Sequence, residues 1–546
     1  MRHTTRAMLV LCAAVAVGAT SCSSAARSSA ARHDPPAPVR LAARTRLPAS
    51  ATSVLAGSPD VVAVGVAQRL FTSSPVVVVA SPNPSADLAA TRQALRAHAP
   101  LLLTSVPGAA MVSAMLRAQV RALDPRAVLA VGVTANVLAA QLPGIRVVTN
   151  PVMLPATKAP APLGYVALLV HPGDSDAATL AAVATARVAG AQVIDVRGDD
   201  PRADPAAITA LSASRPAHVL AIGSGFGPAA RLASRIAVAR TGVQLPGGGQ
   251  VLFPSHLLVA LYGHPGTPAL GVLGQQGLKA SIARAKTVAA QYRSLSRVRV
   301  IPAFEIIATV AEAHPGSDGS YSYESPVASL RPWVRRAKAA GMYVILDLQP
   351  GRASLLAQAK RYQSLLEQPD VGLALDPEWK LGPGQRPLQQ IGSVSITEVN
   401  SVVRWLATLT ARYRLPQKLL VLHQFRLSMI RNEHELDTRY DDLAILIHMD
   451  GQGTPFDKQQ TWQTITRAAP AGVFFGWKNF YVKDHPTLSP RQTIMRTPRL
   501  SMVSYQLSRP RGDPGANTLN PTPLTSGFRC SGSLPAVLPQ QRLTWP

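Results

Sequence analysis

Short apolar runs alternate with amphipathic segments throughout residues 251–506. Eight of the runs have the length and aliphatic composition of buried strands, and the segments between them, such as 326–340 and 396–413, have the period of helices. The strands are expected at 257–263, 298–306, 342–348, 371–376, 418–424, 443–449, 472–477 and 501–505. Eight strand–helix steps over about 250 residues predict a (β/α)8 barrel of the TIM type. Because the eighth run is the weakest, a seven-stranded or open form is the alternative.

Residues 55–245 carry a second pattern, in which one arrangement of strands and helices occurs twice. The matching apolar runs are 76–80 with 166–170 and 128–132 with 219–223. Continuous apolar runs between Ala-rich amphipathic helices indicate parallel strands that are covered on both faces. We therefore predict an α/β protein with two doubly wound repeats, 55–150 and 151–250, in front of the barrel.

The N-terminus has the order of regions found in a secretory signal. Arg2 and Arg6 precede an apolar run over 7–19, and small residues lead directly to Cys22. This arrangement resembles the lipobox of bacterial lipoproteins, which implies removal of residues 1–21 and acylation of Cys22. Several acyl chains would anchor the exported protein at the cell membrane, facing the wall or the medium. An ordinary signal peptide with an incidental Cys is the alternative.

Composition separates the folded part from its ends and limits the class of protein. Residues 22–54 and 507–546 are rich in Ser, Pro or Gly and lack periodicity, which predicts a flexible tether and a tail. The chain has 546 residues, of which 47% are hydrophobic and 15% charged, so global disorder is excluded. Three Cys are too few for a disulfide scaffold, and no further apolar run reaches the ~20 residues of a membrane span.

The net charge of +26 bears on the kinds of molecule that the protein is expected to bind. A basic exported protein is attracted to anionic envelope polymers and lipid headgroups. The Arg usage of a GC-rich coding sequence explains the charge equally well. We expect no nucleic-acid partner, because no recognition motif is present and the chain is predicted to leave the cytoplasm.

The first α/β repeat contains a pattern known from surface proteins. Its strand is followed by Ser81-Pro-Asn-Pro-Ser-Ala-Asp-Leu-Ala-Ala-Thr91, then by Ala99-Pro-Leu-Leu-Leu-Thr104 and by the Val-Leu-Ala-Val-Gly strand. These elements resemble the cell-wall-binding type 2 repeats of bacterial surface proteins, which implies non-covalent attachment to anionic wall polymers. The second repeat lacks the middle element. A generic α/β domain without affinity for the wall is the alternative.

In a (β/α)8 barrel the chemistry lies at the C-terminal ends of the strands. Seven of the predicted strands end in polar or aromatic residues, as a saccharide site requires, because carboxylates move protons and aromatic rings stack on sugars. The candidate catalytic residues are Asp376, Glu378 and Asp450. The residues expected to contact the substrate are Tyr262, His264, Glu305, Asp347, Gln349, Trp379, His423, Gln424, Trp477 and Lys478.

The most specific sequence motif is Asp376-Pro-Glu378. Because residues i and i+2 of a strand share one face, the two carboxylates are expected on the same side of the strand. Two neighbouring carboxylates at the barrel mouth would raise one pKa, so we expect Glu378 to be the acid/base and Asp376 to orient it or to hold an acetamido group. The sequence Leu375-Asp-Pro-Glu-Trp379 resembles the D-x-E motif of family 25 lysozymes and family 18 chitinases. The resemblance implies hydrolysis of N-acetylated sugars.

Three functions stay open at this point. The crowded polar rim favours a glycoside hydrolase. The full D-x-x-D-x-D-x-E motif of the chitinases is absent, and His264 stands where family 25 lysozymes have an acid, which favours a glycan-binding protein without turnover. A solute-binding lipoprotein is the third possibility. No cofactor or metal is expected, because His448, Asp450 and His264 lack a compact ligand spacing.

Overall fold

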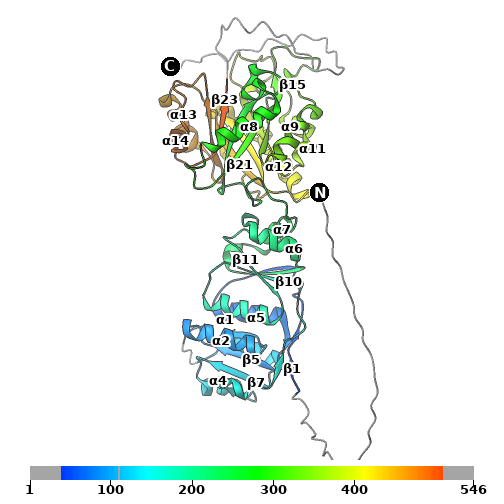
Figure 1. Ribbon diagram of the computed structural model, residues 1–546, viewed down its shortest axis with the longest axis vertical. Coiled ribbons are helices and arrows are strands. Elements are labelled where there is room, and N and C mark those ends of the chain that lie inside the picture. Colours follow the sequence, from blue (N-terminus) through cyan, green and yellow to red (C-terminus); the bar gives the residue numbers. More distant parts are fainter. Residues whose placement is uncertain (1–38, 108–110, 508–546) are drawn as a thin grey trace, which may run out of the picture. The chain divides into compact units, whose positions relative to one another are not determined.

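Parallel strands covered by helices organise the part of the chain that the computed structural model describes, residues 39–107 and 111–507 (Figure 1). In this view the α/β repeats are blue to green and the barrel is green to red. The predicted signal peptide, Cys22 and all but the first residue of the predicted tail lie outside the described residues. Across the described ranges, every helix is too short or too polar to cross a membrane.

Each α/β repeat is built on a sheet whose strands are all parallel. In strand order the first sheet consists of β6 (Leu101–Leu103), β5 (Val76–Ala80), β7 (Ala127–Val131) and β8 (Val147–Val148). The second consists of β11 (Gln192–Asp195), β10 (Val166–Val170), β12 (His218–Ile222) and β3 (Thr52–Leu55). The two predicted doubly wound repeats are confirmed, but the second takes a strand, β3, from the segment that precedes the first.

Helices cover these sheets and pack the two repeats together. Those of the first repeat are α2 (Pro84–Arg96), α3 (Ala114–Leu123) and α4 (Ala135–Gln141), and those of the second are α5 (Ala177–Val188), α6 (Pro205–Ser214) and α7 (Ala229–Ala239). Helix α5 packs against α2 and against α1 (Pro59–Leu70). The hydroxyl of Thr185 on α5 accepts a hydrogen bond of 3.0 Å from the backbone N–H of Leu101. The same hydroxyl donates to the Leu101 carbonyl at 3.3 Å, and small Ala side chains let the two repeats approach closely.

Within the described residues, eight parallel strands close into a barrel. They are β13 (His256–Gly263), β14 (Arg299–Ala311), β16 (Tyr343–Leu348), β17 (Val371–Leu375), β19 (Lys418–Gln424), β21 (Leu443–Met449), β22 (Phe474–Phe480) and β23 (Leu500–Gln506). Strand β23 pairs with both β13 and β22, which closes the ring. The predicted eight-stranded barrel is therefore confirmed, and the open and seven-stranded alternatives are wrong. The end of β14 also pairs antiparallel with β15 (Ser322–Glu324).

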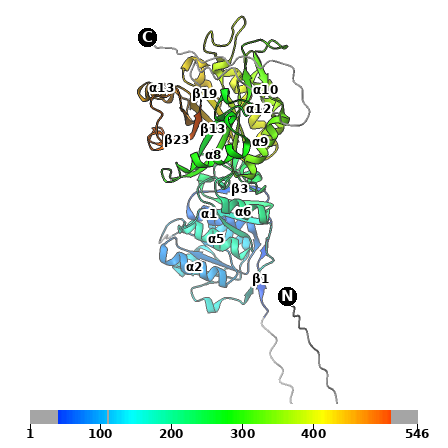
Figure 2. The same ribbon diagram turned by 45° about the horizontal axis from the view of Figure 1, so that its top comes forward.

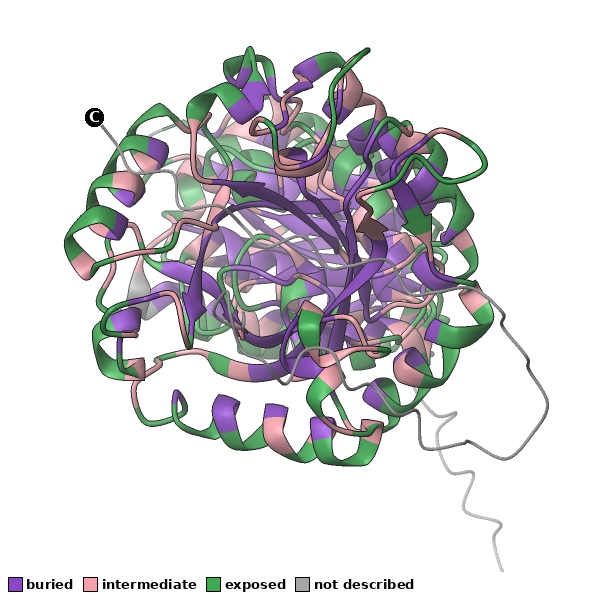
Figure 3. Ribbon diagram, turned by 90° about the horizontal axis from the view of Figure 1, so that it is seen from above, coloured by how far each residue is buried: buried purple, intermediate pink, exposed green. Residues whose placement is uncertain are grey.

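Helices surround the barrel, with their exposed faces outward and their buried faces against the strands (Figures 2 and 3). They are α8 (Leu278–Ala290), α9 (Val327–Ala339), α10 (Leu355–Arg361), α11 (Gln363–Leu366), α12 (Ile396–Arg412), α13 (Pro455–Ala468) and α14 (Pro490–Ile494). In α12 the buried positions recur every three or four residues, and the Ser395 side chain caps the first turn by accepting from the N–H of Glu398. Sequence periodicity thus determines which face of each helix meets the barrel.

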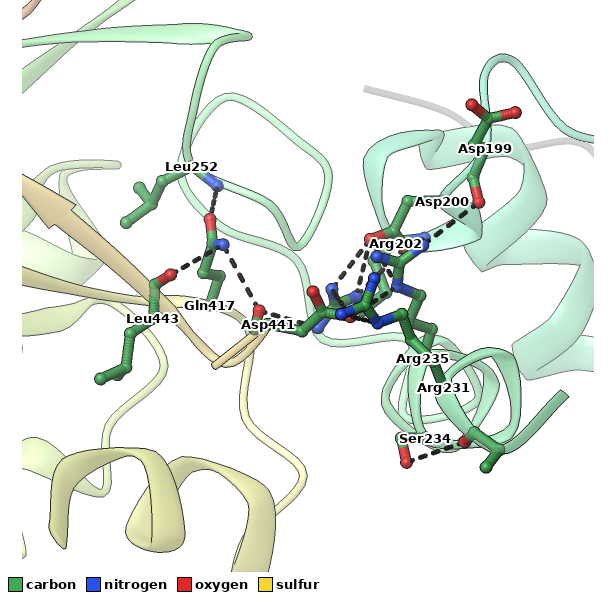
Figure 4. A network of polar contacts seen from close by, with 11 residues as sticks. Asp199, Asp200, Arg202, Arg231, Ser234, Arg235, Leu252, Gln417, Asp441 and Leu443 are labelled. Atoms are coloured by element: carbon green, nitrogen blue, oxygen red, sulfur yellow. Dashed lines mark hydrogen bonds and ion pairs between the residues drawn. The ribbon is translucent and has the colours of Figure 1, made fainter. Parts of the chain in front are cut away.

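A charged network connects the second α/β repeat with the start of β21 (Figure 4). Arg231 and Arg235 of α7 reach the carboxylate of Asp441, at 3.4 and 2.9 Å, and the buried Arg202 donates to the backbone carbonyl of Asp441 at 3.3 Å. The amide of Gln417, before β19, donates to the same carbonyl at 3.4 Å. These contacts lie at the N-terminal ends of the strands, opposite to the ends that carry the candidate site.

Candidate active site

The upper part of the barrel interior is lined by polar side chains. Each strand, or the residue directly after it, contributes one to the same layer: Tyr262, Glu305, Asp347, Asp376, His423, His448, Lys478 and Ser504, all at most 2% exposed. Two residues earlier on each strand, the inward position is apolar or Gly, as at Ala260, Ala303, Ile345, Ala374, Val421, Leu446, Gly476 and Met502. Because side chains alternate along a strand, this shared parity directs the whole polar layer into the lumen.

His423 joins two carboxylates across the lumen. Its Nε2 lies 2.9 Å from Glu305 Oε1, and its Nδ1 lies 3.1 Å from Asp450 Oδ2. Burial and the nearby Lys478 would lower the pKa of His423, but Glu305 and the ion pair with Asp450 raise it well above its usual value. Glu305 is in turn ionised, because His423 outweighs burial and lowers the pKa of Glu305. The centre of the lumen is therefore a buried imidazolium between two carboxylates.

Lys478 completes this charge cluster. Its Nζ lies 3.0 Å from Asp450 Oδ2 and 3.6 Å from the centre of the Tyr262 ring. Burial alone would raise the pKa of Asp450, but Lys478 and the ion pair with His423 lower it strongly. Both cations bind the same oxygen, and within the described chain Asp450 Oδ1 is buried without a hydrogen-bond partner. Asp450 is thus held ionised at neutral pH.

Tyr262, Asp347 and Gln349 form a second hydrogen-bonded group. The Tyr262 hydroxyl donates to Asp347 Oδ2 at 2.9 Å and accepts from Gln349 Nε2 at 3.2 Å. Gln349 Oε1 accepts from the backbone N–H of Ala311 at 3.0 Å, which fixes the orientation of its amide. Burial raises the pKa of Asp347 to about 6, against the lowering effect of His423. This carboxyl group therefore titrates close to neutral pH.

Asp376 and Glu378 do not lie on one continuous strand. Strand β17 ends at Leu375, and Pro377–Trp379 form a 3-10 turn, so the predicted alternation from Asp376 to Glu378 is wrong. Pro377 causes the break, because proline has no N–H for the ladder and a φ suited to the start of a helical turn. Both acids still influence each other: burial and Asp347 raise the pKa of Asp376 well above its usual value, and Glu378 adds to the rise.

Glu378 and Asp450 differ in their charge state. Burial and the charge of Asp450 raise the pKa of Glu378 to about 7, against the lowering effects of Lys478 and Lys483. The pKa of Asp450 moves in the opposite direction, as described above. A carboxyl group that titrates near neutral pH under the influence of one that is ionised is the arrangement needed for a general acid and its partner carboxylate.

Four residues predicted for the site have other surroundings. Gln424 donates from Nε2 to Glu433 Oε2 at 2.8 Å, and Trp477 is fully buried, with its ring centre 5.8 Å from that of Trp462 on α13. Gln424 directly follows the inward-facing His423, and Trp477 directly precedes the inward-facing Lys478. Because side chains alternate along a strand, both point away from the lumen. His264 Nε2 lies 3.2 Å from Ser325 Oγ, and Trp379 lies partly exposed in the turn after Pro377.

Two residues near the site were not predicted. Ser504 on β23 lies in the lumen, 2.8 Å from His448 Nε2, and burial lowers the pKa of His448 to about 3, so that this ring is neutral. The i, i+2 relation of Ser504 to the apolar Met502 would have placed it correctly. Lys483 lies in the loop after β22, where burial lowers its pKa to about 8 while Glu378 and Asp450 raise it. No periodic signal exists for such a loop position.

Neither a cluster of metal-ligating side chains within the described ranges nor a known relative indicates the function. Among the residues that the structure describes, no group of three or more His, Cys, Asp and Glu side chains is arranged to hold a metal ion. No protein-family model and no curated protein sequence matches the chain. The function is therefore argued from the geometry of the barrel.

Proposed function

We propose that the protein is a glycoside hydrolase, anchored in the cell envelope, that acts on a cell-wall or extracellular polysaccharide. The observation that carries the proposal is that the pKa values of two carboxyl groups at the barrel mouth, Glu378 and Asp450, are shifted in opposite directions. That of Glu378 is raised to about 7, whereas that of Asp450 is lowered by Lys478 and His423 despite burial. In most glycosidases two carboxyl groups with different protonation states flank the scissile bond.

The roles follow from these states. Glu378, about half protonated at pH 7, donates a proton to the glycosidic oxygen as the bond to the sugar carbon breaks. Asp450, held ionised by the two cations at Oδ2, either attacks that carbon or activates a water molecule. Asp376, kept protonated by burial and by Asp347, can donate a hydrogen bond to a substrate acetamido oxygen.

Location at the envelope is part of the proposal. The order of charged, apolar and small residues before Cys22 supports export and lipid anchoring. The resemblance of the first α/β repeat to cell-wall-binding repeats and the net charge of +26 support attachment to anionic polymers. Both features would keep the barrel close to an insoluble substrate.

A second candidate function is binding of a glycan without turnover. It is favoured by the extent to which the lumen side chains satisfy one another, since Glu305 pairs with His423 and Asp347 with Tyr262 while all four are at most 2% exposed. A barrel of this kind would recognise sugars only with its rim.

Release of reducing ends from purified peptidoglycan and wall polysaccharides tests both candidates. The protein starting at residue 23 is compared with Glu378→Gln, Asp450→Asn and the control Glu435→Gln, which changes an exposed acid after β19. We expect release by the wild type and the control, and at least ~100-fold less by the other two variants. Equal release by Glu378→Gln would contradict the assigned acid. Retention on the wall pellet without release would favour the binding protein.

A further inference from the structure

A buried ion pair contacts the loop that follows the proposed catalytic residue Asp450. Lys458, on α13, places Nζ 2.5 Å from Oδ2 of Asp484, in the loop after β22, and both side chains are 1% exposed. Neither residue faces the lumen, and the proposed reaction uses neither. Because a buried pair gains little or nothing over apolar residues of the same size, its presence calls for another explanation.

The pair connects three segments around the site. Asp484 also accepts from the backbone N–H of Phe480 at 2.9 Å and from that of Gly453 at 3.3 Å. Lys458 donates a second bond, of 2.8 Å, to the backbone carbonyl of Lys478. The end of β22, the loop after β21 and helix α13 are thus held by two side chains.

Two of these segments, the loop after β21 and β22 with the loop that follows it, carry charged groups of the site. Gly453 lies three residues after Asp450, and the Lys478 carbonyl belongs to the residue whose Nζ binds Asp450. Lys483, whose charge acts on Glu378 and Asp450, directly precedes Asp484 in the chain. A shift of the Asp484 carboxylate would therefore move Lys483 and the loop that begins at Asp450.

We propose that Lys458 and Asp484 are positioning residues: their buried ion pair fixes the loops after β21 and β22, so that Asp450 and Lys483 take up set positions relative to Glu378. The inference rests on the proposed function for its catalytic meaning, although its geometry does not. An ion pair suits this task because its two charges tolerate only a narrow range of separations in a buried setting, whereas apolar side chains can slide past one another.

The pKa of Glu378 reports directly on the Lys458–Asp484 ion pair, which we call the clamp. The charged groups that act on Glu378 are Asp376, His423, Asp450, Lys478 and Lys483. Of these, Lys483 lies next to Asp484 in the chain and lowers the pKa of Glu378. Loss of the clamp should displace Lys483 and the loop that begins at Asp450, whose charges both act on Glu378, so that Glu378 titrates at a different pH from that in the wild type.

Carbon-13 NMR of the full exported chain, labelled at the Glu carboxyl carbons, measures this midpoint. The sequence contains eight glutamates, and Glu378→Gln identifies the signal by its disappearance. We expect Asp484→Asn to shift the Glu378 midpoint by about half a pH unit or more. The matched control is Asp457→Asn, which removes an exposed acid next to Lys458 on the same helix and should leave the midpoint unchanged.

An unchanged Glu378 midpoint in folded Asp484→Asn would overturn the clamp. If that variant does not fold, Asp484→Glu keeps the charge but lengthens the side chain, and the same shift or its absence decides. The readout needs no turnover, so the two proposals fail separately. A shifted midpoint in a protein that releases no sugar would leave the clamp and refute the hydrolase. Sugar release with an identical pH–rate profile in wild type and Asp484→Asn would support the hydrolase and refute the clamp.

Discussion

Replacement of Lys478 by Met tests whether the barrel lumen is one electrostatic unit. Met keeps the apolar stem beside the Tyr262 ring but removes the charge 3.0 Å from Asp450 Oδ2. Two unit charges at that separation interact by about 5.5 kcal/mol at an effective dielectric constant of about 20. His423 remains as a second partner of Asp450, so we expect a loss of about 3–5 kcal/mol in the free energy of unfolding.

The loss should depend on pH in a defined direction. In the wild type, Lys478 and His423 outweigh burial and lower the pKa of Asp450, so that their stabilisation is complete above the unfolded value of about 3.9 and is lost as the pH falls. In Lys478→Met the lowering is weaker and Asp450 takes up a proton at a higher pH. The difference between wild type and variant should therefore be largest near pH 7 and shrink below about pH 4.

Urea unfolding followed by tryptophan fluorescence is a suitable assay. Five of the six Trp belong to the barrel and the sixth is Trp545, so the α/β repeats contribute no signal. Combining Lys478→Met with Asp450→Asn should recover part of the loss, because no unpaired charge is then buried. Lys380→Met is the control, since its 2.8 Å pair with Glu398 is partly exposed and should cost about 1 kcal/mol or less. A loss for Lys478→Met no larger than for the control, or additivity within about 0.5 kcal/mol, would refute the reasoning.

Three further changes test other parts of the molecule. Gly476→Ala should cost about 1–3 kcal/mol in the same fluorescence assay, because the added methyl group would overlap Nδ1 of His448. Thr185→Val should cost about 1–3 kcal/mol and speed hydrogen exchange at the Leu101 amide, which loses its acceptor between the two repeats. Asp441→Asn should lower the stability by about 1 kcal/mol at low salt and by less at about 1 M NaCl, because its three arginine partners are screened there. Its effect should also vanish at acid pH, since those arginines outweigh burial and lower the pKa of Asp441.

The barrel was predictable because each strand is signalled locally. Buried parallel strands appear as continuous apolar runs, and the observed strands begin close to where the runs begin. Two features had no local signal. Strand β3 pairs with β12 of the second repeat although the whole first repeat lies between them in the chain. Strand β14 runs on to Ala311 because its end pairs with β15, and this pairing depends on tertiary contacts.

The site was predictable to the extent that strand alternation holds. The rule that residues i and i+2 share a face places His423 and Lys478 in the lumen, and applied strictly it would have removed Gln424 and Trp477 from the candidates. The rule fails at Glu378, where a proline ends the strand. Lys483 could not be predicted, since its position depends on a loop that the buried pair of Lys458 and Asp484 holds in place.

The two layers of the barrel interior differ in what they contribute to stability. The lower layer is apolar and buries side chains such as Leu258, Ile345 and Val421, which favours folding. The upper layer buries acids and bases, and in the described chain several of their atoms, including Glu305 Oε2 and Asp376 Oδ1, have no hydrogen-bond partner. Apolar side chains in the upper layer would cost less, because each unpaired buried polar atom carries a desolvation penalty of about 1–3 kcal/mol. The barrel concentrates such atoms at the C-terminal ends of its strands, which supports the proposed site there, because charge in a dry interior is an advantage for binding and catalysis.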